Sequence, residues 1–229
     1  ELRAALAQLT TPAGRGAAAL TCAGLSPEGV EVVWFELGRS PPGEPHVPGQ
    51  MVAIDRVGGC VVVALRGSSG PRDILVDLDC EPEEVEFDGR PGLAHKGMLK
   101  SALKLDDCLA AAAQAALERL PPEQQKILLC GHSLGAGVAA LLAKRWNDSG
   151  SPRFATEVRC LAFGCPQVLD ADSAEVACRH TTSFVYGPDI VPRLSLASAT
   201  DLRDVLVRLH DPVAHGLDPC LQAGSLLAA

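Results

Sequence analysis

Residues 127–143 read ILLCGHSLGAGVAALLA, and the rest of the chain is interpreted around this segment. A short apolar run ends at Gly131, and an Ala/Leu-rich helical pattern follows Gly135. A strand, a tight turn between glycines and a helix are the context that a G-x-S-x-G nucleophile elbow requires. Because the two glycines lack a Cβ, strand and helix can approach closely around a strained turn. The pattern predicts that Ser133 lies at the tip of this turn, with its hydroxyl exposed above a sheet.

A second interpretation of the same stretch is a glycine-rich connection in which the serine only caps the helix. The chain holds 22 glycines, so the bare motif alone is weak support for chemistry. The flanking strand and helix patterns favour the nucleophile. They also predict that backbone N–H groups at the start of the helix point at the place where an oxyanion would develop.

The composition indicates one α/β domain with a large core built mostly from Ala, Val and Leu. The chain has 229 residues, of which 47% are hydrophobic and only 3% are aromatic. Its formal net charge of −8 argues against nucleic acid as a partner and against electrostatic adsorption to anionic lipid. Any binding to a lipid surface therefore has to be hydrophobic.

The nine cysteines include no C-x-x-C pair and no pair near histidines at zinc spacing. Several lie inside apolar runs, where a cysteine is usually a small buried hydrophobe. We expect free thiols in a reducing compartment, and a cytoplasmic or membrane-associated location over a secreted one. The composition calls for no metal and no cofactor.

Strand and helix patterns alternate along the chain, which predicts a mostly parallel central sheet with helices on both faces. We expect a single domain over 1–229, with a hairpin turn at Gly58-Gly59. The expected strands are 30–35, 51–55, 60–65, the run before Gly131, 158–163 and 181–186, and the expected helices are 98–120, 137–146, 171–179 and 199–209. The acidic segment 79–94 is interpreted as a solvated loop, or alternatively as a mobile flap.

Three further polar residues are candidates for the site. Ser68 follows the apolar strand 60–65 and could offer both its N–H and its hydroxyl to an oxyanion, although loop serines are common. Asp189 follows another strand and could orient a catalytic base, but an aspartate in a Gly-Pro-Asp turn can simply stabilise that turn. His95 opens a helix, where a structural role is favoured over a catalytic one.

Six blocks of the sequence resemble the class 3 (fungal-type) lipases in order and spacing. They cover roughly residues 50–195, and the stretch 195–204 is similar to the diacylglycerol lipase branch in particular. The blocks are LRGSS at 65–69, Asp73 with Asp77-Leu78, HKGM at 95–98, GHSLGA at 131–136, FGCP at 163–166 and DIVPRL at 189–194.

The resemblance implies an α/β-hydrolase fold and a role for each matching residue. Ser133 matches the nucleophile and Asp189 the triad acid. Ser68 matches the oxyanion-hole residue, with the N–H of Leu134 as the second donor. His132 is implied to pack and not to act as the base, and the His95 position is not the catalytic base either. Residues 69–94 match the place of the lid in fungal members.

The catalytic histidine is the point at which this chain departs from the family pattern. After Asp189 the sequence holds only His210 and His215. His210 ends the expected helix 199–209, and His215 lies in a loop that suits a triad better, although it is close to Asp189 in sequence. We therefore expect the base either at His215 or, by preference, beyond Ala229, with this chain as part of a longer protein.

The expected function is a serine hydrolase that cleaves carboxylic esters of glycerolipids through an acyl-enzyme on Ser133. The resemblance favours diacylglycerol or triacylglycerol as substrate at a membrane or lipid-droplet surface, with phospholipase A1 or galactolipase activity as the close alternative. The alternative from another class is a non-catalytic lipase-like module that binds a lipid or a protein partner.

Overall fold

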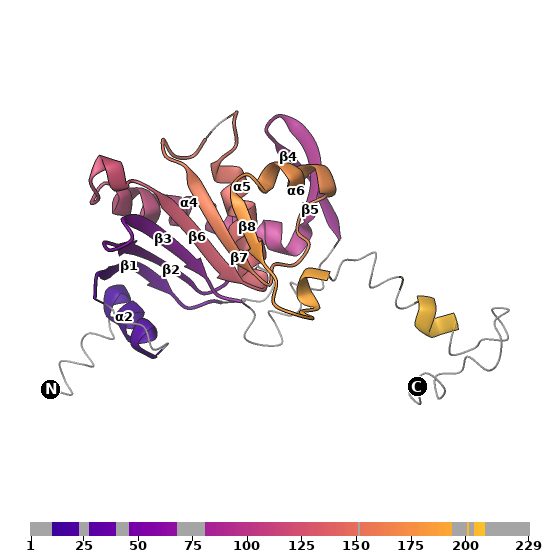
Figure 1. Ribbon diagram of the computed structural model, residues 1–229, viewed down its shortest axis with the longest axis horizontal. Coiled ribbons are helices and arrows are strands. Elements are labelled where there is room, and N and C mark those ends of the chain that lie inside the picture. The colour runs from indigo at the N-terminus through magenta and orange to yellow at the C-terminus, as the bar shows by residue number, and fades with distance from the viewer. Residues whose placement is uncertain are drawn as a thin grey trace. The chain divides into compact units, whose positions relative to one another are not determined.

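A six-stranded sheet forms the centre of the molecule, in the order β1-β2-β3-β6-β7-β8 (Figure 1). The computed structural model describes residues 11–22, 28–39, 46–67, 81–150, 152–193, 201 and 204–208. The strands of this sheet are β1 (Val30–Glu36), β2 (Gln50–Asp55), β3 (Cys60–Leu65), β6 (Ile127–His132), β7 (Val158–Phe163) and β8 (Thr181–Phe184). The expected strands are therefore all present, and only their ends differ.

The sheet has an antiparallel and a parallel half that meet at β3. β1, β2 and β3 pair antiparallel, whereas β3, β6, β7 and β8 pair parallel. The turn between β2 and β3 is closed by Asp55, whose Oδ1 accepts hydrogen bonds from the backbone N–H groups of Val57 and Gly58. The parallel half brings the carboxyl ends of its strands to one edge, where α/β folds place their chemistry.

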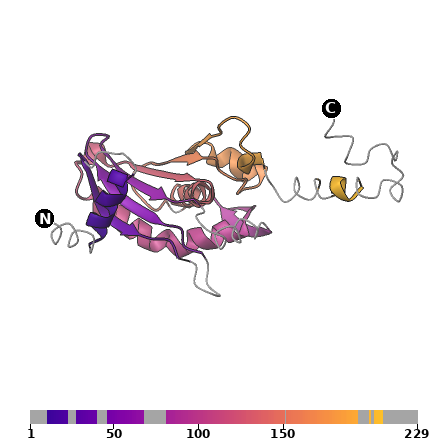
Figure 2. The same cartoon turned by 90° about the horizontal axis from the view of Figure 1, so that it is seen from below.

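Helices lie on both faces of the sheet, as the sequence predicts. α4 (Lys96–Leu117) and α5 (Leu134–Trp146) pack on one face, and α6 (Ala171–Ala177) precedes β8. α2 (Pro12–Cys22) lies beside β1 in Figures 1 and 2. A Cβ on Gly16 of α2 would lie 2.4 Å from Cγ1 of Val32, and Val32 is buried without belonging to the core under α4 and α5. α2 therefore covers the opposite face.

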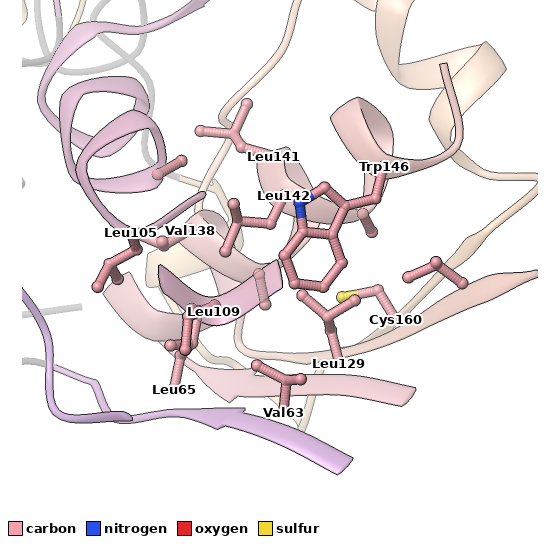
Figure 3. Close-up of a cluster of buried hydrophobic side chains, with 14 of the residues drawn as sticks. Val63, Leu65, Leu105, Leu109, Leu129, Val138, Leu141, Leu142, Trp146 and Cys160 are labelled. Carbon is pink, nitrogen blue, oxygen red and sulfur yellow. The ribbon is translucent and has the colours of Figure 1, made fainter. Parts of the chain in front are cut away.

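The main core fills the space between the sheet and helices α4 and α5. Figure 3 shows Leu105 and Leu109 of α4 and Leu141, Leu142 and Trp146 of α5 above the strands. The strand side is supplied by alternate residues, including Val63, Leu65, Leu129 and Cys160. The buried core is mostly Leu, Val and Ala, as the composition predicts. The six cysteines whose side chains are described are free thiols.

The acidic segment before α4 is a β-hairpin, so the expectation of a loop over 79–94 is wrong for its described part. β4 (Pro82–Phe87) pairs antiparallel with β5 (Arg90–His95) across the two-residue turn Asp88-Gly89. Both turn residues have positive φ, 53° and 71°, as a type I′ turn requires. Val85 and Phe87 face inward and alternate with exposed glutamates, a period of two that the high charge of the segment obscured.

A buried ion pair fastens the tip of this hairpin to the end of α5. Lys144 is 2% exposed, and its ammonium bonds the Asp88 carboxylate and lies 5.0 Å from the centre of the Phe87 ring. Asp88 Oδ1 also accepts from the Ser149 N–H at 2.6 Å. Burial alone would raise the pKa of Asp88, but the hydrogen bonds from Lys144 and Ser149 outweigh it and lower the pKa to about 2.

We expect Asp88→Asn to lower the free energy of unfolding by about 3–5 kcal/mol, because the Lys144 charge stays buried without its partner. Asparagine tolerates the positive φ at this turn, so the backbone conformation should be the same in the variant. Because the native pKa of Asp88 lies below the unfolded value, its stabilisation is present above about pH 4 and disappears as the pH falls towards 2. Urea unfolding between pH 7 and pH 3 measures both effects.

The double variant Asp88→Asn/Lys144→Met is the control, since removing both charges should restore most of the stability. The proposed fastening would be contradicted if the free energy of unfolding of Asp88→Asn were within 1 kcal/mol of the wild-type value and depended on pH in about the same way.

The C-terminal residues separate from the sheet-containing part. Residues 1–192 form one compact unit and 193–229 a second, in which residues 201 and 204–208 are helical. The prediction of a single domain over the whole chain stays a prediction. Within the described ranges, no helix combines the length and the apolar character needed to cross a membrane.

Candidate active site

Ser133 forms a strained turn between β6 and α5. Its φ of 54° and ψ of −126° lie in a region that residues with a side chain rarely adopt, and its hydroxyl makes no capping bond to the helix. The surrounding backbone holds it there: the Ser133 N–H donates to the carbonyl of Phe163 at 2.9 Å, and its own carbonyl accepts from Ala136 and Gly137. A capping serine would use its hydroxyl on the helix, so the nucleophile interpretation fits the geometry better.

The two glycines of the motif are required by close backbone contacts. A Cβ on Gly131 would lie 2.3 Å from the carbonyl oxygen of Gly135. A Cβ on Gly135 would lie 2.4 Å from the carbonyl oxygen of Leu65 and 2.5 Å from that of Arg66. The first turn of α5 therefore packs directly against the end of β3, which leads towards the expected oxyanion-hole residue.

One of the two expected oxyanion donors lies within the described structure. Leu134 is the first residue of α5, and a backbone N–H at that position has no acceptor inside its own helix. It is adjacent to Ser133, at the positive end of the helix dipole, which is the position that the expected oxyanion donor requires. Ser68 lies outside the described residues, two positions after Arg66.

A single peptide, between Phe163 and Gly164, lies between Asp189 and the elbow. Its Oδ1 accepts from the Val191 N–H at 3.0 Å, and its own N–H donates to the Tyr186 carbonyl at 3.1 Å. A Cβ on Gly164 would lie 2.9 Å from Asp189 Oδ2. Because Gly164 follows Phe163, whose carbonyl binds the Ser133 N–H, Ser133 and the Asp189 carboxylate flank the same peptide.

The described histidines near this edge occupy positions that fit structural roles. His95 is the N-cap of α4, and its Nδ1 accepts from the Met98 N–H at 3.4 Å. The ring of His132 lies between two glycines: its Nδ1 would be 3.2 Å from a Cβ on Gly67 and its Nε2 3.7 Å from a Cβ on Gly164. His210 and His215, the candidates for the base, lie outside the described residues.

Comparison with protein families identifies this arrangement. The family model described as Lipase (class 3) matches residues 62–199, which include most of β3, the elbow, Asp189 and the strands between them. This chain belongs to the class 3 lipase family. The match covers well over half of the chain, and the α/β-hydrolase fold follows from it and from the solved structures below.

Curated relatives of this class 3 lipase include two diacylglycerol lipases. Human diacylglycerol lipase-alpha is 32% identical over 191 residues, which is 76% of this chain and 18% of the relative. Mouse diacylglycerol lipase-beta is 35% identical over 168 residues, which is 69% of this chain and 24% of the relative. The chain thus spans about a quarter or less of the length of these two proteins.

The fold of this class 3 lipase also matches solved fungal structures. Rhizomucor miehei triacylglyceride lipase superposes with a TM-score of 0.60 at 23% identity, over 75% of this chain and 63% of that chain. At this identity the likeness establishes the fold alone.

Two features of the class 3 lipase site were not anticipated from the sequence. Gly164 has a φ of 56° and leaves the space beside the Asp189 carboxylate that a Cβ would fill, and the Phe163 carbonyl accepts a hydrogen bond from the Ser133 N–H. Both residues belong to the FGCP block, so the resemblance indicated their position but not what they contact.

Of the predicted lid 69–94, the described part is the β4–β5 hairpin that Lys144 fastens to α5. In the described ranges, no group of three or more His, Cys, Asp or Glu side chains could hold a metal ion.

Proposed function

We propose that this class 3 lipase hydrolyses carboxylic ester bonds of glycerolipids, with diacylglycerol as the favoured substrate and an acyl-enzyme on Ser133 as the intermediate. The observation that carries the proposal is the strained Ser133 elbow with Asp189 across one shared peptide. The relatives named diacylglycerol lipase-alpha and -beta support the substrate class.

The chemistry follows from the positions of the groups. A histidine base removes the hydroxyl proton of Ser133, and the oxygen attacks the ester carbonyl. The Leu134 N–H, together with Ser68, stabilises the oxyanion of the tetrahedral intermediate. The histidine returns the proton to the leaving alcohol, and water then releases the fatty acid by the same steps. Asp189 orients the histidine and stabilises its charged form.

Apolar side chains around the site support contact with a lipid surface. Phe163 and Phe184 stack with their ring centres 4.9 Å apart and are each about half exposed. Tyr186 and Ile190, in the loop that carries Asp189, are 91% and 61% exposed. Since the net charge of −8 disfavours anionic surfaces, we propose hydrophobic contact with a membrane or lipid droplet from a cytoplasmic or membrane-associated location.

Fatty-acid release from a panel of lipids tests this function. The panel contains 1,2-diacylglycerol, triacylglycerol, phosphatidylcholine and monogalactosyldiacylglycerol with identical acyl chains, presented in the same mixed micelles. We expect kcat/KM to be highest for diacylglycerol.

The other outcomes are decisive as well. Preferred cleavage of phosphatidylcholine or of the galactolipid would replace diacylglycerol with phospholipase A1 or galactolipase activity. A folded protein that binds the micelles but releases no fatty acid from any of the four lipids, also when the sequence beyond Ala229 is included, would support the non-catalytic module and overturn the proposal.

A further inference from the structure

We infer that a groove between α2 and strands β1–β3 binds a single long acyl chain, on the face of the sheet opposite the main core. The choice of ligand rests on the proposed function, because an ester hydrolase of glycerolipids handles such chains. The groove has a volume of about 320 Å³. Its apolar lining comes from Leu20, Phe35, Leu37, Met51 and Ala64.

The strand register makes three of these side chains into one stripe. Phe35 pairs with Met51, and Met51 pairs with Ala64, so the three lie directly opposite one another across β1, β2 and β3. Side chains at paired positions share one face of the sheet. Leu20 of α2 adds a wall from the helix that covers this face. A stripe across three strands beneath a helix suits an extended hydrocarbon chain.

The groove approaches the candidate active site at the end of β3. Leu65 and Arg66 line the groove, and the carbonyl oxygens of these two residues are the atoms that a Cβ on Gly135 would contact. The groove and the Ser133 elbow are therefore separated by little more than the backbone of residues 65–66.

Arg66 supplies a charge that fits the carboxyl end of such a chain. Its guanidinium lies over two glycines, with Nη2 3.2 Å from a Cβ position on Gly38 and Nε 3.5 Å from one on Gly49. Across the described ranges, no carboxylate forms an ion pair with Arg66, although Glu36 also lines the groove. The positive charge of Arg66 attracts a fatty-acid carboxylate, and the negative charge of Glu36 opposes it.

One acyl-chain chemistry can come from two sources, the ester substrate or the released fatty acid. Binding is measured in the Ser133→Ala protein, where turnover cannot consume the ligand. The probes are oleic acid, methyl oleate and saturated acids of eight to twelve carbons, each used below its micelle concentration to displace a fluorescent fatty acid. Ala64→Phe fills the groove, and Val57→Phe adds the same ring at an 86% exposed position in the β2–β3 turn.

We expect Ala64→Phe to weaken oleic acid binding about tenfold or more, and Val57→Phe to leave the Kd within twofold of the parent. In the parent, the Kd should fall about fourfold for each methylene added, and this dependence should flatten in Ala64→Phe. Circular dichroism and thermal melts identify a variant that has failed to fold.

The charge variants keep the proposal testable even if Ala64→Phe does not fold. Arg66→Gln should weaken oleic acid binding by about two- to fivefold and Glu36→Gln should strengthen it, with methyl oleate unaffected by either. That pattern identifies the released fatty acid as the ligand. If oleic acid and methyl oleate bind equally well, neither charge variant changes their Kd and Ala64→Phe blocks both, the ligand of the groove is the acyl chain of the substrate.

Equal affinities for oleic acid in folded Ala64→Phe and Val57→Phe would overturn the inference. If Ala64→Phe does not fold, two other results together would overturn the inference. The Kd of oleic acid would not change in opposite directions in Arg66→Gln and Glu36→Gln, and the Kd would not depend on the length of the acyl chain. Because binding is measured without turnover, these results are separate from the hydrolysis assay. A protein that binds acyl chains in the groove but cleaves no ester, also with the sequence beyond Ala229 included, would refute the proposed function and leave this site in place.

Discussion

Replacing Ser133 with alanine is expected to lower kcat for ester hydrolysis about 10⁶-fold, because no other group can take its place at the tip of the elbow. The φ of 54° holds the side chain at the junction of β6 and α5, next to the Leu134 N–H that we propose as an oxyanion donor. Alanine preserves the backbone contacts of this turn, so the melting temperature should change little. The measurements are steady-state hydrolysis and covalent labelling with a fluorophosphonate.

Ser183→Ala is the matched control, since Ser183 is an exposed serine on β8. It should label and turn over like the wild type. Fluorophosphonate labelling that persists in Ser133→Ala would show that another residue is the nucleophile. His215→Ala then tests the base: loss of labelling in that variant places the base at His215, and full labelling excludes His215 from that role.

Asp189→Asn is expected to lower kcat about 10⁴-fold, since an amide neither fixes the imidazole tautomer nor stabilises the imidazolium. The substitution keeps the shape of the side chain, so an oxygen can still accept from the Val191 N–H. KM should change much less than kcat, because Asp189 acts on the histidine and not on the substrate. Stopped-flow acylation with a chromogenic ester measures the step that is slowed.

Asp172→Asn provides the comparison for this prediction. Asp172 is an exposed aspartate in the first turn of α6, and its loss should leave kcat within a few-fold of the wild type. If Asp189→Asn lowers kcat no more than Asp172→Asn does, another carboxylate orients the base.

The sequence was most informative where short-range sterics decide the structure. Gly131 and Gly135 around Ser133, between an apolar strand and an Ala/Leu-rich helix, predicted the elbow, and contacts of 2.3–2.5 Å at both glycine Cβ positions explain why it has to be so. The alternating strands and helices likewise predicted the parallel half of the sheet. His95 was assigned a structural role at a helix entrance, and it caps α4.

The hairpin β4–β5 shows where the sequence was misread. The number of acidic residues suggested a solvated loop, but Val85 and Phe87 alternate with glutamates and lead into the turn Asp88-Gly89. That alternation with an Asp-Gly dipeptide is a hairpin signal available in the sequence. What the sequence could not supply is the partner of the hairpin, since Lys144 lies 56 residues away from Asp88.

The motif blocks of the sequence indicate the family, whereas local sterics and the periodicity of apolar residues predict the order of strands and helices and the elbow at Ser133. The tertiary structure alone decided that Asp189 and Ser133 flank one peptide, that Lys144 is buried against Asp88, and that the Arg66 guanidinium lies beside an apolar groove. These juxtapositions join residues far apart in the chain. They arise only when the packed sheet brings strand ends together, and no local pattern records which distant groups then meet.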